Sequence, residues 1–264
     1  MQAAVSTACL FPAPTEDALT QLAEQGIRTA EAFLNAPSEY DLAFAKGLKR
    51  TAEQHQMQIV SVHPYTAPIE GLMLFSPYTR RCEDFLEESK RVFDLMNLVG
   101  AKYYILHGAK LGFSRSTEFY CERFAMLSEL GESFGVTVTQ ENVHLFESQN
   151  LPFLQEFCRI LSDRAKLTFD VKQAVRGGMD IFSAVETVGS HIVHIHLSDH
   201  GKQGDCLRIG KGEFEIPTFL QALHQIGYDG TLVIELYRDA FGSAADLADD
   251  YHQLQTLILQ SEKK

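Results

Sequence analysis

Four side chains of metal-binding type stand at or near the ends of four apolar segments in the second half of the chain. Glu141 closes VTVTQE, Asp170 closes KLTFD, His196 lies in HIVHIHLSD and Glu235 lies in GTLVIEL. Polar and apolar residues alternate around His196, as in a strand with two different faces. Grouped carboxylates repel one another, so a divalent cation is their natural partner. Mixed carboxylate and imidazole ligands suit Mn²⁺, Zn²⁺ or Co²⁺ better than Ca²⁺.

Two more histidines stand at the ends of earlier apolar segments, in His63-Pro64 and His107-Gly108. Any one of these six residues can be an ordinary polar residue at a strand end. Six such residues at one end of six different strands favour a shared site. We therefore expect His63 and His107 to line the same site, where they bind a second metal ion or the substrate.

The composition limits the class of protein. The chain has 264 residues, of which 45% are hydrophobic, and a formal net charge of −12. A strongly acidic chain repels phosphate backbones, so nucleic acid is not an expected partner. No apolar run reaches the length of a membrane span, and the five cysteines form no CxxC pair. We expect a soluble cytoplasmic protein with reduced thiols.

Eight predicted strands alternate with eight predicted helices. The predicted strands are Val5–Leu10, Ile27–Leu34, Gln58–His63, Lys102–His107, Val136–Glu141, Lys166–Asp170, Ile192–Leu197 and Thr231–Leu236. The predicted helices are Thr15–Gln25, Ser38–His55, Tyr78–Val99, Ser116–Phe134, Pro152–Ser162, Asp180–Val188, Pro217–Ile226 and Ser243–Gln260. The connection Tyr65–Pro77 is long, which is typical of lids and binding segments.

This alternation predicts the fold class, which is α/β. Strands that alternate with helices imply parallel pairing through right-handed crossovers. Eight such units in about 250 residues predict a closed (β/α)8 TIM barrel, a single domain over residues 1–264. A doubly wound open sheet is the alternative, but the segment TACLFPAP lacks the glycine-rich phosphate turn expected there. In a barrel, the carboxyl ends of the strands surround the mouth, where active sites lie.

Four stretches carry a family resemblance: TQEN around Glu141, TFDVKQA around Asp170, HIHLSD around His196 and GYDGTLVIEL up to Glu235. They resemble the xylose-isomerase-like TIM barrel superfamily, which includes sugar phosphate isomerases and epimerases and the family-2 AP endonucleases. The resemblance covers nearly the whole chain. It implies that these four residues are the metal ligands, and that Glu141 and Glu235 act as acid and base on opposite faces of a sugar carbon.

The resemblance implies a metal-dependent isomerase or epimerase of carbohydrate metabolism, acting on a small sugar or sugar phosphate. One divalent ion (Mn²⁺, Zn²⁺, Co²⁺ or Mg²⁺), with a second as an open alternative, would polarise the carbonyl. One glutamate would remove the adjacent proton to give a metal-stabilised cis-enediolate, and the other would return a proton. Dehydration of a keto-cyclitol or dehydroshikimate-like substrate uses the same first step and is an alternative. A barrel that binds metal and ligand without turnover is another.

An AP endonuclease-type phosphodiesterase is the rival from another class. His63 and His107 match two further histidines of that branch. Its third metal needs a histidine three residues after the aspartate, where this chain has Gln173, and an Asp-x-His in a loop that reads GDCLRIGKG here. A trinuclear site is therefore not expected.

Several further residues are candidates with two interpretations each. Glu31 can bind substrate or pair structurally, Gln173 can bind a substrate hydroxyl, and Arg208 can meet a phosphate or carboxylate or stay solvated. Asp199 can orient the ring of His196 or cap a loop, and Lys172 can be a surface charge. The sequence leaves the oligomeric state open, with a homodimer or a homotetramer as alternatives.

Overall fold

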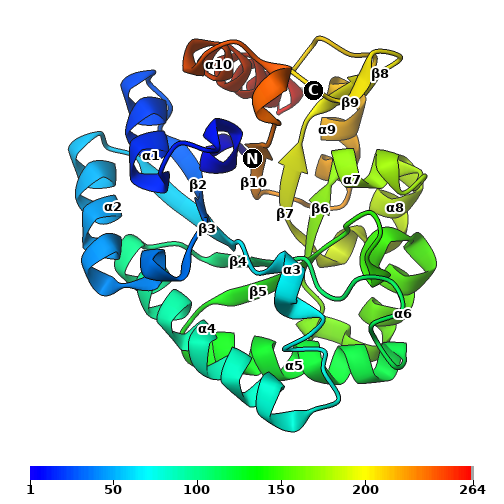
Figure 1. Cartoon of the computed structure of the whole chain (residues 1–264). Coiled ribbons are helices and arrows are strands. Elements are labelled where there is room, and N and C mark those ends of the chain that lie inside the picture. The colour runs from blue at the N-terminus through cyan, green and yellow to red at the C-terminus, as the bar shows by residue number, and fades with distance from the viewer. Residues whose placement is uncertain (263–264) are drawn as a thin grey trace.

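Eight parallel strands close into a barrel in the computed structural model of the chain, which describes residues 1–262. Figure 1 looks into the barrel, with helices packed around its outside. The strand order is β1-β10-β7-β6-β5-β4-β3-β2, and β1 pairs with both β10 and β2. The prediction of a (β/α)8 barrel is confirmed.

The elements of the barrel follow the predicted alternation. Its strands are β1 (Gln2–Ser6), β2 (Thr29–Leu34), β3 (Gln58–Pro64), β4 (Tyr103–Leu106), β5 (Thr137–Glu141), β6 (Leu167–Asp170), β7 (Ile192–Leu197) and β10 (Thr231–Ile234). The helices around it are α1 (Thr15–Glu24), α2 (Leu42–Gln54), α4 (Thr79–Val99), α5 (Thr117–Ser133), α6 (Leu151–Leu161), α8 (Ile181–Val188), α9 (Ile216–Gln225) and α10 (Ala244–Ser261).

Burial on both faces explains the apolar composition of the strands. All four residues of β10 are buried, as expected of a parallel strand that is covered by helices outside and packed inside the barrel. The helices have one apolar face each. On α10 the buried face includes Leu247, Tyr251, Leu254 and Ile258, spaced by three or four residues. No helix within residues 1–262 is long and apolar enough to cross a membrane.

The first strand differs from its predicted range. The strand begins at Gln2 and ends at Ser6, and residues 7–10 form a 3-10 turn. The Ser6 hydroxyl accepts a hydrogen bond from the backbone N–H of Ala8 at 3.3 Å. Such a local side-chain bond competes with continued strand pairing, so the chain turns here. Cys9 therefore lies in the turn, where its thiol contacts the end of β10.

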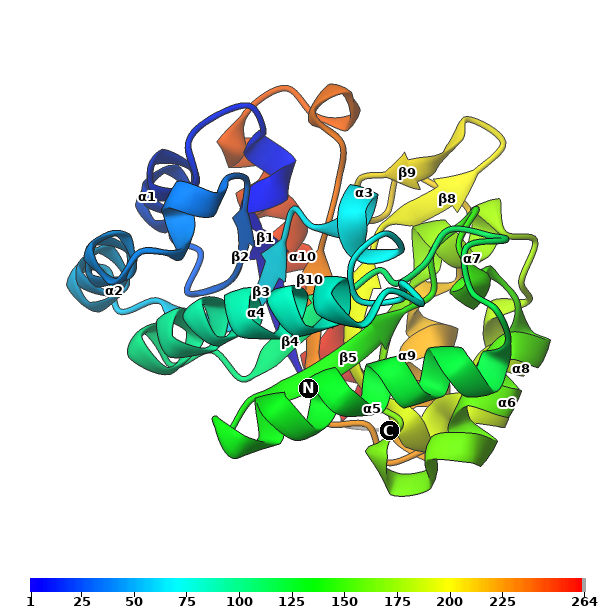
Figure 2. The same cartoon turned by 60° about the horizontal axis from the view of Figure 1, so that its bottom comes forward.

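Three short elements are absent from the prediction. They are α3 (Ala67–Glu70), α7 (Val171–Arg176) and an antiparallel hairpin of β8 (Asp199–Gly201) and β9 (Gly204–Leu207). Figure 2 shows α3 and the hairpin at the end of the barrel opposite the two termini. Each element is too short to show a hydrophobic period in sequence. The helix α7 follows β6 directly because the Asp170 carboxylate accepts a hydrogen bond from the backbone N–H of Gln173 at 2.8 Å.

Candidate active site and metal centre

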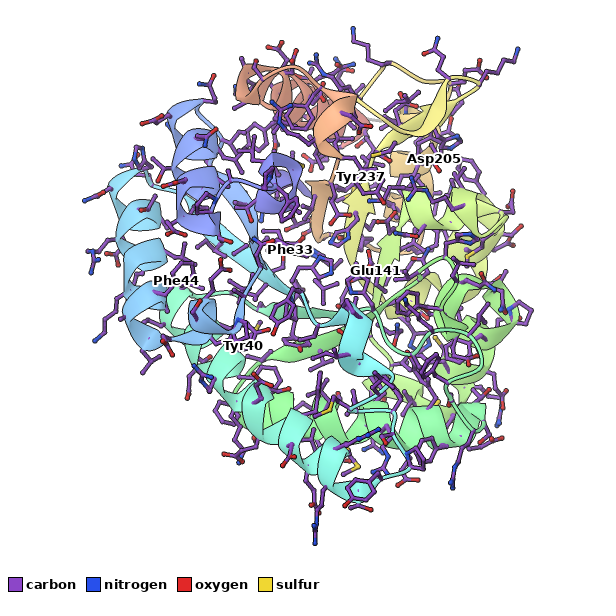
Figure 3. The ribbon with its side chains drawn as sticks, in the orientation of Figure 1. Phe33, Tyr40, Phe44, Glu141, Asp205 and Tyr237 are labelled. Carbon is purple, nitrogen blue, oxygen red and sulfur yellow. The ribbon has the colours of Figure 1, made fainter. Side chains whose placement is uncertain are left out.

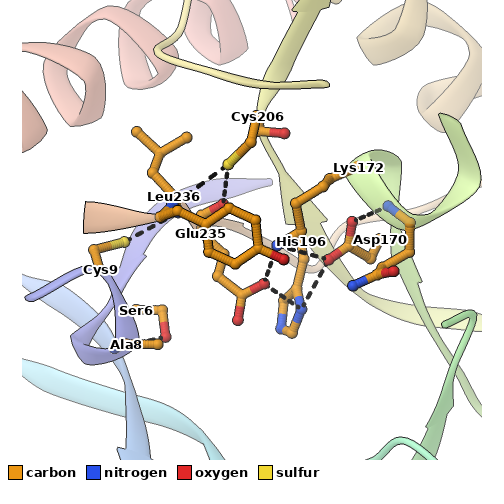
Figure 4. A network of polar contacts seen from close by, with 12 residues as sticks. Ser6, Ala8, Cys9, Asp170, Lys172, His196, Cys206, Glu235 and Leu236 are labelled. Atoms are coloured by element: carbon orange, nitrogen blue, oxygen red, sulfur yellow. Dashed lines mark hydrogen bonds and ion pairs between the residues drawn. The ribbon is translucent and has the colours of Figure 1, made fainter. Parts of the chain in front are cut away.

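The ends of β5, β6, β7 and β10 bring four potential ligands together. Glu141, Asp170, His196 and Glu235 each offer one ligand atom, and these atoms all lie within 4.8 Å of one another. The first three side chains are almost fully buried, and that of Glu235 is 12% exposed. Figure 4 shows Asp170, His196 and Glu235 facing one another. The sequence-predicted ligand set thus converges at the barrel mouth.

The motif QEN fixes the first two carboxylates to each other. The Asn142 side chain donates to the backbone carbonyl of Asp170 at 2.9 Å and accepts from its backbone N–H at 2.7 Å. The Ser148 hydroxyl donates to the backbone carbonyl of Glu141 at 2.7 Å. These bonds satisfy buried backbone groups at the two strand ends, so the carboxylates project from a rigid frame.

The two ring nitrogens of His196 have different partners. Nδ1 lies 2.9 Å from Oε1 of Glu141, and Nε2 lies 3.1 Å from Oε2 of Glu31. A carboxylate on one ring nitrogen fixes the tautomer and turns the other nitrogen toward a metal ion. Nδ1 is therefore the nitrogen that faces the ligand cluster.

Glu31 lies beneath the cluster and is fully buried. Its carboxylate accepts hydrogen bonds from Ser6 at 3.2 Å and Ser61 at 2.8 Å and lies 3.2 Å from Nε2 of His194. Burial alone would raise the pKa of Glu31, but the charge of His196 and its histidine hydrogen bonds hold it well below its usual range. Of the two interpretations of Glu31, substrate binding and structural pairing, its burial below the cavity and its contacts with His194 and His196 favour the second.

Lys172 is the residue of this site that the sequence interpretation missed. Its side chain is 3% exposed, and Nζ lies 2.8 Å from Oε2 of Glu235 and 3.5 Å from Oδ2 of Asp170. Burial disfavours the charged amine, but Asp170 and Glu235 raise the pKa of Lys172 well above its usual range. The signal that could have found it is its spacing, because α7 begins at the strand end and its second residue stays at the mouth.

The donor set fits a divalent cation. Oε2 of Glu141 and Oδ2 of Asp170 are buried without a hydrogen-bond partner among the described residues. Burial raises the pKa of Glu141, against the hydrogen bond from His196. Nζ of Lys172 lies 3.5 Å from Oδ2 of Asp170, and Nε2 of His107 lies 3.3 Å from Oε2 of Glu141, but neither contact is a hydrogen bond. Buried carboxylate oxygens of this kind are suited to bind a cation, and oxygen and imidazole donors suit Mn²⁺, Co²⁺ or Zn²⁺.

His63 and His107 line the same mouth, as predicted from their strand ends. Their Nε2 atoms lie 3.2 Å apart, and Nε2 of His107 lies 3.3 Å from Oε2 of Glu141. Burial opposes the charged form of His63, but the carboxylates of Glu235 and Glu31, 3.7 and 3.8 Å from its Nδ1, raise its pKa to about 9. Burial and the neighbouring charge of His63 hold the pKa of His107 well below its usual value. The pair is therefore one charged and one neutral imidazole, and its role in binding a second ion stays a prediction.

A cavity of about 590 Å³ opens above these residues. Its wall carries Phe11, Phe33, Tyr65, Leu236 and Tyr237, and its floor includes His63, His107, Glu141, Lys172 and Glu235. In Figure 3, Phe33, Glu141 and Tyr237 lie around the centre of the barrel mouth. Gln173 also lines the cavity, and its side-chain oxygen accepts from the backbone N–H of His144 at 3.1 Å. The site is a polar floor under an apolar, aromatic wall.

Two candidates lie elsewhere. The Asp199 carboxylate accepts from the backbone N–H groups of Gly212 at 3.0 Å and Phe214 at 3.1 Å, so it caps its loop and does not orient His196. Arg208 pairs with Asp250 at 3.1 Å and with Asp246, both on α10. Neither interpretation of Arg208, a substrate-anion contact or a solvated loop residue, describes this placement: Arg208 directly follows β9, and its guanidinium is engaged by the carboxylates of α10.

Comparisons with known proteins agree with this barrel. A family model described as xylose isomerase-like TIM barrel matches residues 19–257. An uncharacterized protein of Mycobacterium leprae is 24% identical over 269 residues, which cover 92% of this chain and 91% of that protein. An uncharacterized protein of Methanocaldococcus jannaschii is 27% identical over 159 residues, 56% of this chain and 54% of that protein. The chain thus spans about half the length of this archaeal relative.

Several solved structures have a similar shape. A D-tagatose 3-epimerase-like protein superposes with a TM-score of 0.80 at 19% identity, covering 100% of this chain and 99% of that one. An L-ribulose 3-epimerase gives 0.78 at 15% identity, covering 100% and 96%. A probable 3-DHS dehydratase from Bacillus anthracis gives 0.76 at 13% identity, covering 97% and 99%. At these identities the likeness supports the fold, and the family model, which matches most of the chain, carries the assignment: the chain belongs to the xylose isomerase-like TIM barrel family.

Proposed function

We propose that this protein is a divalent-metal-dependent epimerase or isomerase of a small, uncharged hydroxy-ketone, of which a ketose sugar is the simplest example. The observation that carries the proposal is the placement of two glutamates in one ligand cluster. Glu141 comes from β5 and Glu235 from β10, and both line the cavity floor. Carboxylates on opposite sides of a bound carbon can remove a proton from one face and return one to the other.

Glu141, Asp170, His196 and Glu235 would hold a divalent ion, which would supply a Lewis acid for a substrate carbonyl. One glutamate, ionised, would accept the proton from the carbon next to that carbonyl, which leaves an enediolate. The other glutamate, protonated in the same complex, would donate its proton to the opposite face, or to the neighbouring carbon for isomerisation, so that the two glutamates exchange protonation states. Lys172, beside Glu235, adds a fixed positive charge where negative charge develops.

The charges around the cavity favour a neutral substrate over a sugar phosphate. Of the lysine and arginine side chains in residues 1–262, Lys172 is the one that lines the cavity, and it pairs with Glu235. Arg176 is engaged nearby with Asp205 at 2.5 Å and with the Tyr237 hydroxyl at 2.6 Å. A phosphate would meet no cation free of a carboxylate, and bound phosphates normally have such partners. The same argument weighs against a phosphodiester substrate.

A substrate panel tests the proposal. The Mn²⁺-loaded protein is incubated with ketohexoses and ketopentoses, the corresponding ketose phosphates, a keto-cyclitol and an abasic-site duplex, and the products are separated by chromatography. We expect interconversion of a free ketose or dehydration of the keto-cyclitol. The double variant Glu141→Gln, Glu235→Gln is the matched control. Nicking of the duplex with no sugar turnover would instead support the phosphodiesterase alternative.

A further inference from the structure

The strand β10, which Glu235 directly follows, is paired with both of its neighbouring strands only as far as Ile234. The last pairs of β10 are Ile234 with Val5 of β1 and with Leu197 of β7. One more bond follows, from the backbone N–H of Glu235 to the carbonyl of Leu197 at 3.3 Å. Beyond it, β1 has turned away at Ser6 and β7 has passed into the hairpin. Residues 235–237 therefore cross the barrel mouth without a strand on either side.

Two cysteine thiols replace the missing strands. On the β1 side, Sγ of Cys9 lies 3.5 Å from the carbonyl of Ile234 and accepts from the backbone N–H of Leu236 at 3.2 Å. On the β7 side, Sγ of Cys206 lies 3.9 Å from the carbonyl of Glu235 and accepts from the backbone N–H of Tyr237 at 3.4 Å. Figure 4 shows the two sulfur atoms on either side of the segment.

The order of these contacts is that of a parallel ladder. In a strand, the backbone groups of successive residues point alternately to the two neighbouring strands. Residues 234 and 236 turn to Cys9, and residues 235 and 237 turn to Cys206. Each thiol thus donates to one carbonyl and accepts from the N–H group two residues further on, which is the pattern that a paired strand would provide.

The surroundings make these contacts consequential. Leu236 is 2% exposed, Cys9 is fully buried and Cys206 is 9% exposed, so the backbone groups bonded to Cys9 have little access to water, whereas Tyr237 on the Cys206 side is 45% exposed. A buried backbone group that loses its hydrogen-bond partner destabilises the folded state. Burial raises the pKa of Cys9 to about 12 and also raises that of Cys206, so both thiols keep the proton that they donate.

We infer that Cys9 and Cys206 are positioning residues. Their thiols continue the pattern of parallel-strand hydrogen bonds beyond β10, and they hold Glu235 in its place within the cluster of four ligands. The inference rests on the proposed function, because the position of Glu235 matters when it binds the metal ion and transfers the proton. The thiols touch the backbone around Glu235, not the reacting atoms. Neither acts as a nucleophile.

Amide hydrogen exchange tests the ladder without any metal ion. In the wild-type protein we expect slow exchange at the backbone N–H groups of Leu236 and Tyr237. Cys9→Ala should speed exchange at Leu236, and Cys206→Ala should speed it at Tyr237. Cys121→Ala is the matched control, because Cys121 is a buried residue of α5 whose thiol makes no hydrogen bond within residues 1–262. Unchanged exchange in both ladder variants would overturn the inference.

Metal affinity tests the positioning role. Titration with Mn²⁺ should show binding weakened about tenfold in Cys9→Ala and Cys206→Ala, as for other residues that orient a ligand. The serine variants of both positions, which keep a donor and an acceptor, should recover part of the loss and serve if an alanine variant fails to fold. Cys121→Ala should bind Mn²⁺ as the wild type does. Wild-type affinity in both ladder variants would overturn the inference.

The two measurements separate the inference from the proposed function. If the wild type binds no Mn²⁺ but shows the predicted exchange pattern, the proposed function fails, and with it the positioning role. If the wild type binds Mn²⁺ and both ladder variants match it in either measurement, the inference alone fails.

Discussion

The position of Glu31 changes the interpretation of the site most, because this residue lies below the ligand cluster and does not line the cavity. Its carboxylate contacts Nε2 of His196 at 3.1 Å, and the opposite ring nitrogen faces Glu141. From the sequence, Asp199, which follows His196 by three residues, is a candidate for this orienting task, with a loop cap as the alternative. The actual partner comes from a strand 165 positions away in sequence, a distance that local spacing does not span.

This difference predicts contrasting effects of two conservative variants. Glu31→Gln removes the charge that fixes the His196 ring, so Mn²⁺ affinity should fall about 10–100-fold. Asp199→Asn should leave Mn²⁺ affinity at the wild-type value, because that carboxylate bonds only loop backbone among the contacts described. Calorimetric titration of both variants checks the pair. Equal effects in the two variants would contradict the assigned role of Glu31.

Lys172 makes the second prediction at this scale. Lys172→Met removes the ammonium between Asp170 and Glu235, so the metal-free protein should lose stability, by about 3–5 kcal/mol for a broken buried ion pair. Added Mn²⁺ should then stabilise the variant more than the wild type, because the ion supplies the missing charge. Thermal melts with Mn²⁺ and with chelator measure both effects. Lys49→Met, which removes a half-exposed partner of Glu53 on α2, is the control and should change little. A melt of Lys172→Met that equals the wild-type melt in both conditions would refute the account.

At the scale of elements, α3 is held against the end of β4 by one buried carboxyl. Glu70 accepts from the backbone N–H of Gly108 at 2.5 Å and from the Thr66 hydroxyl at 2.7 Å. Burial raises the pKa of Glu70 to about 7, although both hydrogen bonds lower it. The loop that carries α3 also contributes Tyr65 to the cavity wall, so the state of this carboxyl bears on the shape of the site.

The Glu70 shift sets the sign of a pH effect. The folded pKa lies above the unfolded value of 4.5, so between these values the folded state holds more protons and stability falls as pH rises. Glu70→Gln has a side chain of the same shape that does not ionise. Between pH 4.5 and pH 7 its free energy of unfolding, relative to that of the wild type, should rise by about 3 kcal/mol. Urea unfolding at several pH values measures the difference. A gap between the two proteins that stays constant with pH would exclude this role.

The long elements were predictable from sequence and the short ones were not. The predicted segments Ile192–Leu197 and Tyr78–Val99 correspond to β7 and α4 within one residue at each end, because each is long enough for a clear period. Helix α7 and the β8–β9 hairpin depend instead on a side-chain cap at Asp170 and on loop bonds to Asp199. A side-chain cap and a hairpin held by loop contacts give no hydrophobic period that a sequence pattern could show.

At the scale of the whole molecule, the barrel makes one site out of residues that are far apart in sequence. Strand-end position sufficed to predict that Glu141, Asp170, His196 and Glu235 converge, because every parallel strand of a closed barrel ends at the same mouth. It did not suffice for Arg208 or Lys172. Whether a residue outside the barrel strands faces the mouth depends on the path of the chain around it. Arg208 directly follows β9, and Lys172 is the second residue of α7. Lys172 is buried beside two carboxylates because α7 begins directly at the end of β6, and its spacing from Asp170 is the one sequence signal of this placement.

Glu141 at the end of β5 and Glu235 at the end of β10 meet at the barrel mouth. The central claim is that these two glutamates exchange a proton with a substrate carbon. Solvent deuterium wash-in tests it most directly. The Mn²⁺-loaded protein is incubated in D₂O with the ketose that it turns over, and deuterium at the carbon next to the carbonyl is followed by NMR. We predict incorporation by the wild type and a loss of about 10²–10⁴-fold in Glu141→Gln and Glu235→Gln with metal content matched. Metal-loaded variants that exchange at the wild-type rate would contradict the account.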